Sequence, residues 1–505
     1  MSHIPSSNSI SDNLYSIKAV RDLDRLAIEN MNDSGILLMK RAGDAVLAEL
    51  LEAFGRPALI TVFCGSGNNA GDGYIVAALA SQKKIPVTVY ELGSQNKFSK
   101  ETRQARKFAE QSNVSILAFD KSAKPLEGII VDSLLGVGYS GTLSESYTQA
   151  VSVINGAELP VLSVDIPSGL DADTGAVVSL AVKADVTVTF IGAKKGLFTG
   201  RGPAHCGDII FNSLDISDHI FENVQPQAQL LDSYNLLDIL PEWDVDVYKS
   251  QRGHSMIIGG DLGYGGAAAL ASEACLKTGC GLTSVATQPQ HVSAILARCP
   301  EVMTYGITSG QQLEPLLERP DVLVIGPGLG RSPWSEQLLQ KAINSGLPLV
   351  LDADALNILA ESRLDISKQH SWVMTPHPGE AARLLGTTVA EVEADRFAAA
   401  RKIQKKYNAL VLLKGPGTLI AGQDVIIKVC PYGNSAMATA GMGDLLSGII
   451  GSLIAQGLSL QDSAELGCCL HSCAADIAVS EQGPRGLVAS DILFYLHQLL
   501  NREYL

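Results

Sequence analysis

The sequence predicts an α/β protein with two domains, each built on a parallel sheet between layers of helices. Short runs of Val, Ile and Leu, typical of buried parallel strands, alternate along the chain with segments of helical periodicity. This alternation weakens between Asp215 and Gln251 and then begins again. The composition agrees, because the 505 residues are 46% hydrophobic and only 5% aromatic, with 48 glycines. We therefore expect one domain at residues 1–225 and a second at residues 226–505.

The first domain is expected to begin with helices and to continue with buried strands. Apolar residues recur at helical spacing over residues 17–27 and 36–47. In open parallel sheets, ligands bind beyond the carboxyl ends of the strands, so the polar residues at those ends are candidate site residues. The runs that read as strands are 59–64, 87–90, 128–131, 161–164 and 186–190, with a helix expected at 75–80.

The second domain shows the same alternation. A short helix is expected at 234–240 and a longer one at 463–480. The longer helix carries a cluster of sulfur and imidazole side chains, which we expect to pack as core because no second pair elsewhere has zinc-ligand spacing. These residues are Cys468, Cys469, His471 and Cys473. The runs that read as strands are 255–258, 322–325, 349–351, 372–374 and 410–413.

Charge and composition exclude several functional classes. The net charge of −15 argues against nucleic acid as the main partner. Residues 1–13 lack an apolar signal core, and no apolar run approaches the ~18 residues of a membrane span. The nine cysteines are scattered and odd in number, which suits a reducing compartment. We expect a soluble, cytoplasmic protein that does not bind membranes.

The most informative motif is the small, glycine-rich stretch 433–444, which is followed directly by the apolar run 445–450. Free backbone N–H groups at the start of a helix attract an anion. Asp444 would stand there as a base beside a phosphoryl group held by backbone amides. The alternative is that Asp444 only caps the helix. No Walker loop occurs in the sequence, which excludes a P-loop kinase.

Four further motifs follow strands of the second domain, at residues 326–330, 352–357, 375–380 and 414–418. His377 lies between two prolines that restrict its direction, which favours a substrate contact over an isolated structural histidine. Lys414 stands beside glycine and threonine as a candidate phosphate neutraliser, although an ordinary surface lysine would read the same way.

Three polar turns occur at strand ends of the first domain, at residues 65–73, 131–138 and 163–170. The first turn combines Asn68, Asn69 and Asp72 with glycines that allow a ligand to approach the backbone. Amide and carboxylate oxygens favour a cation or a hydroxyl-rich ligand over a bare phosphate. Each single Asp also fits an ordinary turn residue, but three such turns at strand ends favour a site.

Residues 16–214 resemble the epimerase domain of the NAD(P)H-hydrate repair enzymes. The resemblance implies a Rossmann-like, three-layer αβα domain that binds K⁺ and epimerises C6 of hydrated NADH or NADPH (NADHX and NADPHX). The implied potassium ligands are Asn69, Asp132 and Ser168, and Asp165 is the candidate acid–base residue. The implied hydrate-binding residues are Asn68, Asn69, Ala70, Gly71, Asp72, Gly136, Val137, Gly138, Tyr139, Ser140, Gly141, Thr142, Tyr147 and Asp165.

The sequence departs from this family pattern at one position. The family loop usually reads Asn-Asn-Gly-Gly-Asp, and here Ala70 replaces the first glycine. If that position required a positive φ, alanine would cost on the order of 1 kcal/mol there.

Residues 248–500 resemble the dehydratase partner of the same repair system, which has a ribokinase-like fold. The resemblance implies ADP as co-substrate, with Mg²⁺, for removal of the added water from one epimer of the hydrate. A homo-oligomer is also expected. The implied hydrate-binding residues are Ala267, Gly328, His377 and Asp444, and the implied ADP-binding residues are Lys414, Gly415, Pro416, Gly417, Thr418 and Gly443.

The residues suit this chemistry, because the hydroxide of the hydrate is a poor leaving group and phosphate is a better one. Our hypothesis is that Asp444 deprotonates the C6 hydroxyl, which attacks the terminal phosphorus of ADP, while amides at 441–443 stabilise the developing charge. Elimination then gives NAD(P)H, AMP and phosphate. The alternative is a ribokinase-like small-molecule kinase whose first domain is a non-catalytic ligand-binding module.

Overall fold

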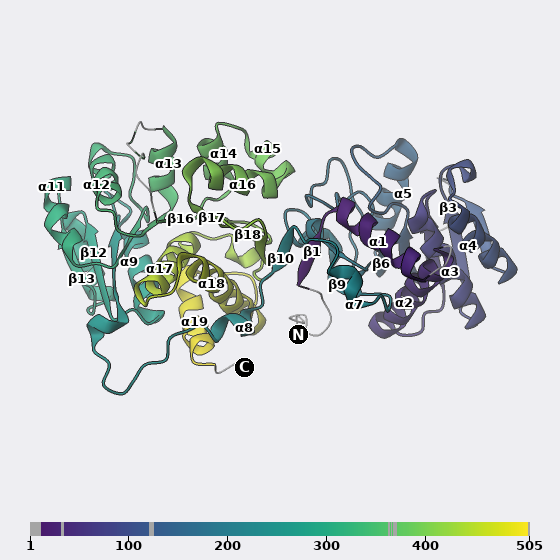
Figure 1. The fold of residues 1–505 in the computed structure, drawn as a ribbon, viewed down its shortest axis with the longest axis horizontal. Coiled ribbons are helices and arrows are strands. Elements are labelled where there is room, and N and C mark those ends of the chain that lie inside the picture. The colour runs from purple at the N-terminus through teal and green to yellow at the C-terminus, as the bar shows by residue number, and fades with distance from the viewer. Residues whose placement is uncertain are drawn as a thin grey trace. The chain divides into compact units, whose positions relative to one another are not determined.

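A computed structural model describes residues 12–31, 35–120, 126–361, 364, 366 and 371–502. The chain forms two compact units, the first ending at Gln229 and the second beginning at Leu230 (Figure 1). Both units alternate strands and helices, which confirms the predicted α/β class. No helix within the described ranges is long and apolar enough to cross a membrane.

The first unit contains a seven-stranded sheet in the order β4-β3-β2-β5-β6-β7-β9, with every neighbouring pair parallel. The five strands predicted here are present. β4 and β9 were missed because their residues are largely exposed or only half-buried, so they lack the apolar run of a buried strand. The strands are β2 (Ile60–Cys64), β3 (Val87–Glu91), β4 (Ser115–Ala118), β5 (Ile129–Ser133), β6 (Val161–Val164), β7 (Val186–Phe190) and β9 (Asp208–Asn212).

A separate, short strand β1 (Asn13–Tyr15) pairs in parallel with β8 (Ala193–Lys194) and antiparallel with β10 (Ala228–Leu230). The helices of this unit are α1 (Ile17–Met31), α2 (Ile36–Phe54), α3 (Asn68–Gln82), α4 (Lys100–Gln111), α5 (Glu145–Gly156), α6 (Pro203–Cys206) and α7 (Asp218–Phe221), with 3₁₀ turns η1 (Gln95–Lys97) and η2 (Lys195–Phe198).

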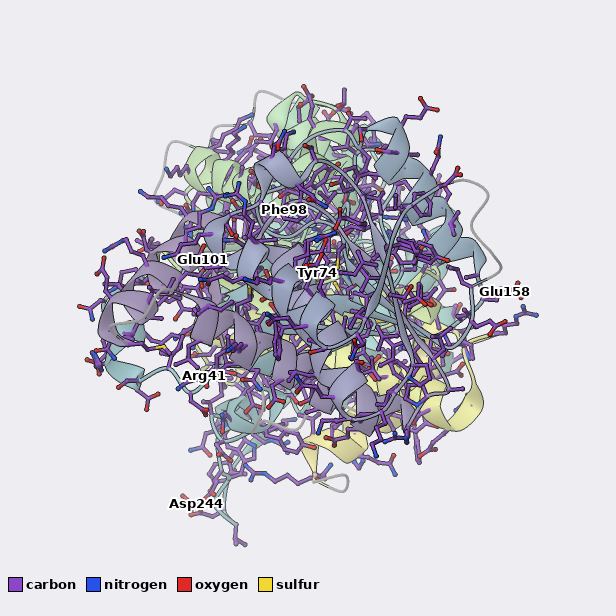
Figure 2. All side chains as sticks on the ribbon, turned by 90° about the vertical axis from the view of Figure 1, so that its right-hand side faces the viewer. Arg41, Tyr74, Phe98, Glu101, Glu158 and Asp244 are labelled. Atoms are coloured by element: carbon purple, nitrogen blue, oxygen red, sulfur yellow. The ribbon has the colours of Figure 1, made fainter. Side chains whose placement is uncertain are left out.

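Two apolar clusters cover the two faces of this sheet. Successive side chains of a strand point to opposite faces, and Val62 and Phe63 of β2 accordingly belong to different clusters. The first cluster includes residues of α1 to α4, and the second includes residues of α5. In the first, the ring centroids of Tyr74 and Phe98 lie 6.2 Å apart (Figure 2). The domain is therefore the predicted three-layer αβα arrangement.

The start of α3 differs from the prediction. We expected residues 65–73 to form a loop, but α3 begins at Asn68 and only residues 65–67 form the turn after β2. The glycines here serve close packing. A Cβ on Gly73 would lie 2.5 Å from Ser133 Oγ, and a Cβ on Gly71 would lie 2.5 Å from the Met39 side chain. The helix predicted at 75–80 is therefore present but begins earlier, and periodicity did not reveal its first two turns because nearly all sides of α3 are buried.

The second unit contains strands in the order β13-β12-β11-β14-β15-β16-β17-β18-β19. Neighbours are parallel from β13 to β17, whereas β18 and β19 pair antiparallel. All five predicted strands are present; β12, β13, β18 and β19 were missed. The strands are β11 (His254–Ile258), β12 (Leu282–Thr287), β13 (Met303–Gly306), β14 (Val322–Ile325), β15 (Leu349–Leu351), β16 (Trp372–Met374), β17 (Leu410–Leu413), β18 (Thr418–Ala421) and β19 (Ile427–Cys430).

The helix α17 packs closely against α9, since a Cβ on Gly448 would lie 2.1 Å from the Ala271 carbonyl oxygen. The helices are α8 (Ser233–Leu237), α9 (Gly265–Lys277), α10 (Val292–Arg298), α11 (Gly310–Leu313), α12 (Pro333–Asn344), α13 (Ala353–Glu361), α14 (Pro378–Leu385), α15 (Val389–Ala394), α16 (Arg396–Tyr407), α17 (Met442–Ala455), α18 (Leu460–Gln482) and α19 (Ile492–Leu500). The 3₁₀ turns are η3 (Lys249–Arg252), η4 (Pro289–His291), η5 (Glu314–Glu318), η6 (Ser435–Met437) and η7 (Ala489–Asp491).

The cysteine cluster of α18 packs as core, as predicted. Cys468 and Cys469 belong to one apolar cluster and Cys473 to another. His471 is buried beside them, which lowers its pKa to about 4. Within the parts of the chain that the structure describes, no group of three or more His, Cys, Asp or Glu residues could hold a metal ion.

Candidate active sites

The N-terminal domain contains a cavity of about 990 Å³ at the carboxyl ends of its parallel strands. Segments that follow β2, β5, β6 and β7 line it, together with residues of α1 and α2. The structure therefore brings three of the predicted polar turns to one place. The predicted hydrate-binding residues in the lining are Asn68, Asn69, Asp72, Gly136, Val137, Gly138, Tyr139, Ser140 and Asp165.

The other residues predicted to bind the hydrate lie outside this lining, and their role stays a prediction. Ala70 is buried in the first turn of α3 and is not among the residues with a left-handed φ. The penalty that a positive φ would impose on alanine therefore does not arise. The residues outside the lining are Ala70, Gly71, Gly141, Thr142 and Tyr147.

The three predicted potassium ligands lie around the backbone of Leu135, which lines the cavity. Asn69 Nδ2 donates to the Leu135 carbonyl at 2.9 Å, and Leu135 N donates to Ser168 Oγ at 2.9 Å. Ser168 Oγ donates to Asp132 Oδ1 at 2.6 Å. All three predicted ligands are buried, and Asn69 Oδ1 has no hydrogen-bond partner among the described residues. This set of oxygens suits a hard cation such as K⁺.

Asp165 is held by a buried lysine. It follows β6 in the left-handed conformation, with φ 67°, and its Oδ1 accepts a hydrogen bond from Lys194 Nζ. Lys194 also donates to Thr189 Oγ1 at 3.1 Å and to the Phe190 carbonyl at 3.0 Å. The Lys194 side chain is 1% exposed and that of Asp165 is 14% exposed. The ammonium group thus stabilises a carboxylate at the cavity wall.

Two further carboxyl groups in the lining of this cavity have raised pKa values. Burial raises the pKa of Asp24 to about 6, and nearby Lys194 and Asp165 act on it in opposite directions. Burial, together with the charges of Asp165 and Asp24, raises the pKa of Asp72 well above its ordinary value. The cavity therefore combines one carboxylate paired with a lysine and two carboxyl groups that burial favours in the neutral form.

Neither Lys194 nor Asp24 was predicted from the sequence. Lys194 follows the apolar run of β7 and has no motif of its own. Asp24 carried a usable signal, because it lies on α1 one turn after buried Val20, next to buried Leu23. An acidic residue on the buried side of an amphipathic helix is unusual and deserved a functional interpretation.

In the C-terminal domain, the helix α17 begins as the sequence predicted. Gly441 occupies the N-cap position in the left-handed conformation, with φ 93°, and Asp444 lies in the first turn. The interpretation of Asp444 as the cap residue is therefore wrong. A Cβ on Gly443 would lie 3.3 Å from Lys414 Nζ and 3.5 Å from Asp352 Oδ2. The first turn of α17 thus stands directly against the residues that follow β15 and β17.

Asp352 organises these strand ends. Lys414 Nζ donates to its Oδ1 at 2.8 Å, Thr375 Oγ1 to the same oxygen at 2.7 Å, and Ser447 Oγ to Oδ2 at 2.8 Å. Burial alone would raise the pKa of Asp352, but Lys414 and the two hydroxyl groups lower it below its ordinary value. Asp352 is therefore an ionised anchor for Lys414, a role that the sequence analysis did not assign to it.

Two other carboxyl groups near Lys414 have pKa values near neutrality. Burial and the charge of Asp352 raise the pKa of Asp444 to about 7, while Lys414 opposes the shift. Burial raises the pKa of Glu380 to about 7, with the same opposition from Lys414. Conversely, burial alone would lower the pKa of Lys414, but the surrounding carboxylates raise it. Asp444 thus has the pKa of a general base that works near neutral pH.

His377 has a structural role that the sequence analysis did not foresee. It is the N-cap of α14, and its Nδ1 accepts a hydrogen bond from Gly379 N at 2.9 Å. In return, Glu380 Oε2 accepts from His377 N at 2.7 Å, which completes a capping box. The side chain is 51% exposed, and its Nε2 lies 3.4 Å from Glu380 Oε1. Its predicted contact with substrate stays a prediction.

The other residues predicted for this site fall into two groups, Ala267 with Gly328 and the segment 414–418. Ala267 and Gly328 lie together, since a Cβ on Gly328 would be 3.0 Å from Ala267 Cβ. The segment 414–418 turns over the fully buried guanidinium of Arg396, whose Nη2 donates to the Lys414 carbonyl at 3.1 Å. A Cβ on Gly415 would lie 2.7 Å from Arg396 Nη1. Arg396 was missed because a lone arginine in a helical run gives no sequence signal.

Comparison with known proteins agrees with this two-part organisation. Residues 255–498 match the family model described as NAD(P)H-hydrate dehydratase, and residues 35–196 match the YjeF-related protein N-terminus. The class is therefore a hydrate dehydratase domain joined to a YjeF-type domain. A solved ribokinase-like superfamily protein from Enterococcus faecalis is 29% identical, with a TM-score of 0.51 over 55% of this chain and 96% of that one.

Curated relatives extend over nearly the whole chain. The bifunctional NAD(P)H-hydrate repair enzyme Nnr of Coxiella burnetii is 45% identical over 488 residues, which cover 97% of this chain and 99% of the relative. That of Escherichia coli is 38% identical over 495 residues, covering 98% and 95%. The chain belongs to the family of bifunctional NAD(P)H-hydrate repair enzymes.

Proposed function

We infer that this protein repairs hydrated NADH and NADPH. Its N-terminal domain, residues 1–225, epimerises the hydrate at C6, and its C-terminal domain, residues 226–505, dehydrates the S epimer with ADP as co-substrate. The observation that carries the inference is the position of Asp444 in the first turn of α17, with Gly443 directly against Lys414 and Asp352. The relatives support it, because they carry this activity in their names and align along the whole chain.

The proposed dehydration begins with a proton transfer to Asp444. This residue has a pKa of about 7, so it can accept the proton of the C6 hydroxyl near neutral pH. The freed oxygen attacks the terminal phosphorus of ADP, and backbone amides at the start of α17 with Lys414 stabilise the charge that develops. The ring nitrogen then expels phosphate to give an N1=C6 iminium ion, and loss of the C5 proton to water returns the electron pair as the C5=C6 double bond. The products are NAD(P)H, AMP and phosphate. The ADP-binding residues in this proposal are Lys414, Gly415, Pro416, Gly417, Thr418 and Gly443.

In the hydrate-binding part of this site we place Ala267, Gly328 and His377 beside Asp444. Gly328 packs against Ala267 and Tyr264, since a Cβ at its position would lie 3.0 Å from Ala267 Cβ and 2.8 Å from Tyr264 Cβ. We propose that Mg²⁺ enters with the nucleotide, and we assign it no protein ligand.

In the N-terminal domain we propose that the hydrate occupies the 990 Å³ cavity, with Asp165 as an acid–base residue. Asn69, Asp132 and Ser168 would hold K⁺, which supplies a fixed positive charge at the edge of the cavity. The unsatisfied Asn69 Oδ1 supports this assignment. We also propose a homo-oligomer in the cytoplasm, which light scattering and cell fractionation can test.

The decisive experiment follows both hydrate epimers by chromatography, with and without ADP, in the wild type and in Asp444→Asn. The variant should lose ADP-dependent recovery of the near-ultraviolet absorbance of reduced nicotinamide, while epimer interconversion continues. Full recovery of this absorbance in the variant would contradict the mechanism.

Release of inorganic phosphate in the same assay separates repair from the alternative of a small-molecule kinase. A kinase leaves a stable phosphorylated product, whereas the repair reaction releases phosphate in proportion to the NAD(P)H formed. An accumulating phosphorylated hydrate would favour the kinase.

A further inference from the structure

The N-terminal cavity holds a lysine that cannot act on a ligand directly. Lys194 Nζ donates to Asp165, to Thr189 Oγ1 at 3.1 Å and to the Phe190 carbonyl at 3.0 Å. An ammonium group has three hydrogens, so these three acceptors satisfy it. With its side chain 1% exposed, Lys194 can influence chemistry in the cavity only through Asp165.

The bonds to Asp165 are concentrated on one of its two oxygens. Oδ1 accepts from Lys194 Nζ, from Thr189 Oγ1 at 3.3 Å and from Phe190 N at 3.4 Å. In the described part of the chain, no donor is bonded to Oδ2. Because Asp165 lines the cavity, Oδ2 is the atom left to exchange a proton with a bound ligand.

A carboxyl group of α1 also reaches this cavity. Asp24 is carried by α1, outside every turn that the sequence singled out, and lines the cavity with Arg21 and Ile28 of the same helix. No hydrogen bond within the described residues holds its carboxyl group. Burial raises its pKa to about 6, which keeps a neutral fraction available near neutral pH. The charged and titratable groups that face it are Lys194, Asp165, Arg21 and Asp72.

We propose that Asp24 is the proton-transfer partner of Asp165 in C6 epimerisation, and that Lys194 is a positioning residue that holds Oδ1 of Asp165 and leaves its Oδ2 for the ligand. This inference rests on the proposed epimerase function. It adds two residues that the family resemblance did not supply, and it assigns the two carboxyl groups opposite roles.

Asp24 gives a proton to the C6 hydroxyl, the C6–O bond breaks with its electron pair leaving on water, and the N1 lone pair forms an N1=C6 double bond. A water molecule then adds to C6 from the opposite face, its electron pair forms the new C–O bond, and its proton passes to Asp165 Oδ2. The N1=C6 π electrons return to N1. The reverse epimerisation uses the same groups with exchanged roles.

The test compares Asp24→Asn with Asp22→Asn, a matched control on the same helix whose side chain is 46% exposed and lies outside the cavity lining. Each variant is given one purified epimer without ADP, and formation of the other is followed by chromatography after subtraction of the rate without enzyme. D24N should lower kcat at least about 100-fold, while D22N stays within twofold of wild type. D24N with wild-type kcat would overturn the proposal.

Isotope incorporation tests the bond that breaks. In water enriched in oxygen-18, the wild type should introduce the label at C6 once per epimerisation, and retention of the original oxygen would overturn the step. Failure of the wild type to interconvert epimers would instead reject the proposed epimerase function itself.

The role of Lys194 is tested with Lys194→Met and the conservative Lys194→Arg. K194M should lower kcat at least about 10-fold with little change in KM for the hydrate, and K194R should restore part of the loss, because it returns a cation beside Asp165. A merely structural role would reduce the amount of folded enzyme without this separation of kcat from KM. Unchanged kcat in folded K194M would overturn the assignment.

Discussion

The two candidate sites use a Lys–Asp pair in opposite ways. In the N-terminal cavity, Lys194 gives its hydrogens to protein acceptors and fixes Asp165. In the C-terminal site, Lys414 bonds Asp352 at 2.8 Å and lies beside the first turn of α17, with Glu380 3.9 Å away. Lys414 therefore has fewer protein acceptors than Lys194, and we propose that its remaining hydrogens bind a phosphate. Burial and the number of partners, not residue type, decide whether a lysine orients a neighbour or binds a ligand.

The largest effect that this comparison predicts is at Lys414. Lys414→Met should lower ADP-dependent dehydration at least about 100-fold, because the cation that faces the developing phosphate charge is lost. It should also lower the free energy of unfolding by about 3–5 kcal/mol, because Asp352 is left buried without its counter-charge. Steady-state kinetics and urea unfolding measure the two effects.

A lysine-to-methionine change at exposed Lys402 of α16 controls for the loss of a positive charge and should change neither quantity. If the Lys414 variant dehydrated the hydrate at a rate within threefold of wild type, Lys414 would not bind the ligand, and it would not differ from Lys194 in this respect.

The next prediction concerns the potassium ion that we propose for the N-terminal site. Replacing K⁺ with Na⁺, or Asn69 with Ala, should lower epimerase activity about 10-fold. Dehydration of the purified S epimer by the same chain should stay within twofold. If these changes lowered epimerisation and dehydration equally, the effect would not come from potassium at the N-terminal site.

A smaller effect is expected at the start of α17. Gly443→Ala should raise KM for ADP about fivefold, because its Cβ would lie 3.3 Å from Lys414 Nζ, in the space where the amides meet the phosphate. Gly156→Ala in α5 is the control, since a Cβ there meets nothing within 4 Å. An unchanged KM would mean that ADP does not approach Gly443.

The smallest effect is on stability. The pKa of Asp444 is raised from 3.8 to about 7 on folding, so the folded state binds this proton more tightly than the unfolded state. The free energy of unfolding therefore falls as pH rises from about 4 to about 7. Asp444→Asn should remove this loss and be more stable than wild type at pH 8 by about 1 kcal/mol, because Lys414 loses a neighbouring charge in the same change.

Urea unfolding of both proteins at pH 4 and pH 8 tests the sign. The difference between them should be larger at pH 8 than at pH 4. A variant that is less stable than wild type at pH 8 would contradict the burial argument.

Most of the fold could be read from the sequence because buried parallel strands are short apolar runs between polar turns. All ten predicted strands are present. The missed strands β4 and β9 carry exposed or half-buried residues, and α3 lacks periodicity because nearly all of its sides are buried. Sequence periodicity reports the contrast between an apolar, buried face and a polar, exposed face. It therefore gives no signal for an element that is buried, or exposed, on all sides.

The sequence by itself determined which turns carry side-chain oxygen and nitrogen atoms and which carry free backbone N–H groups. These features depend only on the residue types that follow a strand or begin a helix. It pointed in this way to Asn69, Asp132, Asp165 and Asp444. Only the tertiary structure decided that Lys194 pairs with Asp165 and that Asp24 reaches the cavity from α1. It also decided that Asp352 contacts both Lys414 and α17. Such contacts link residues distant in sequence, and burial together with the neighbouring charges and hydrogen bonds sets whether a carboxyl group stays ionised.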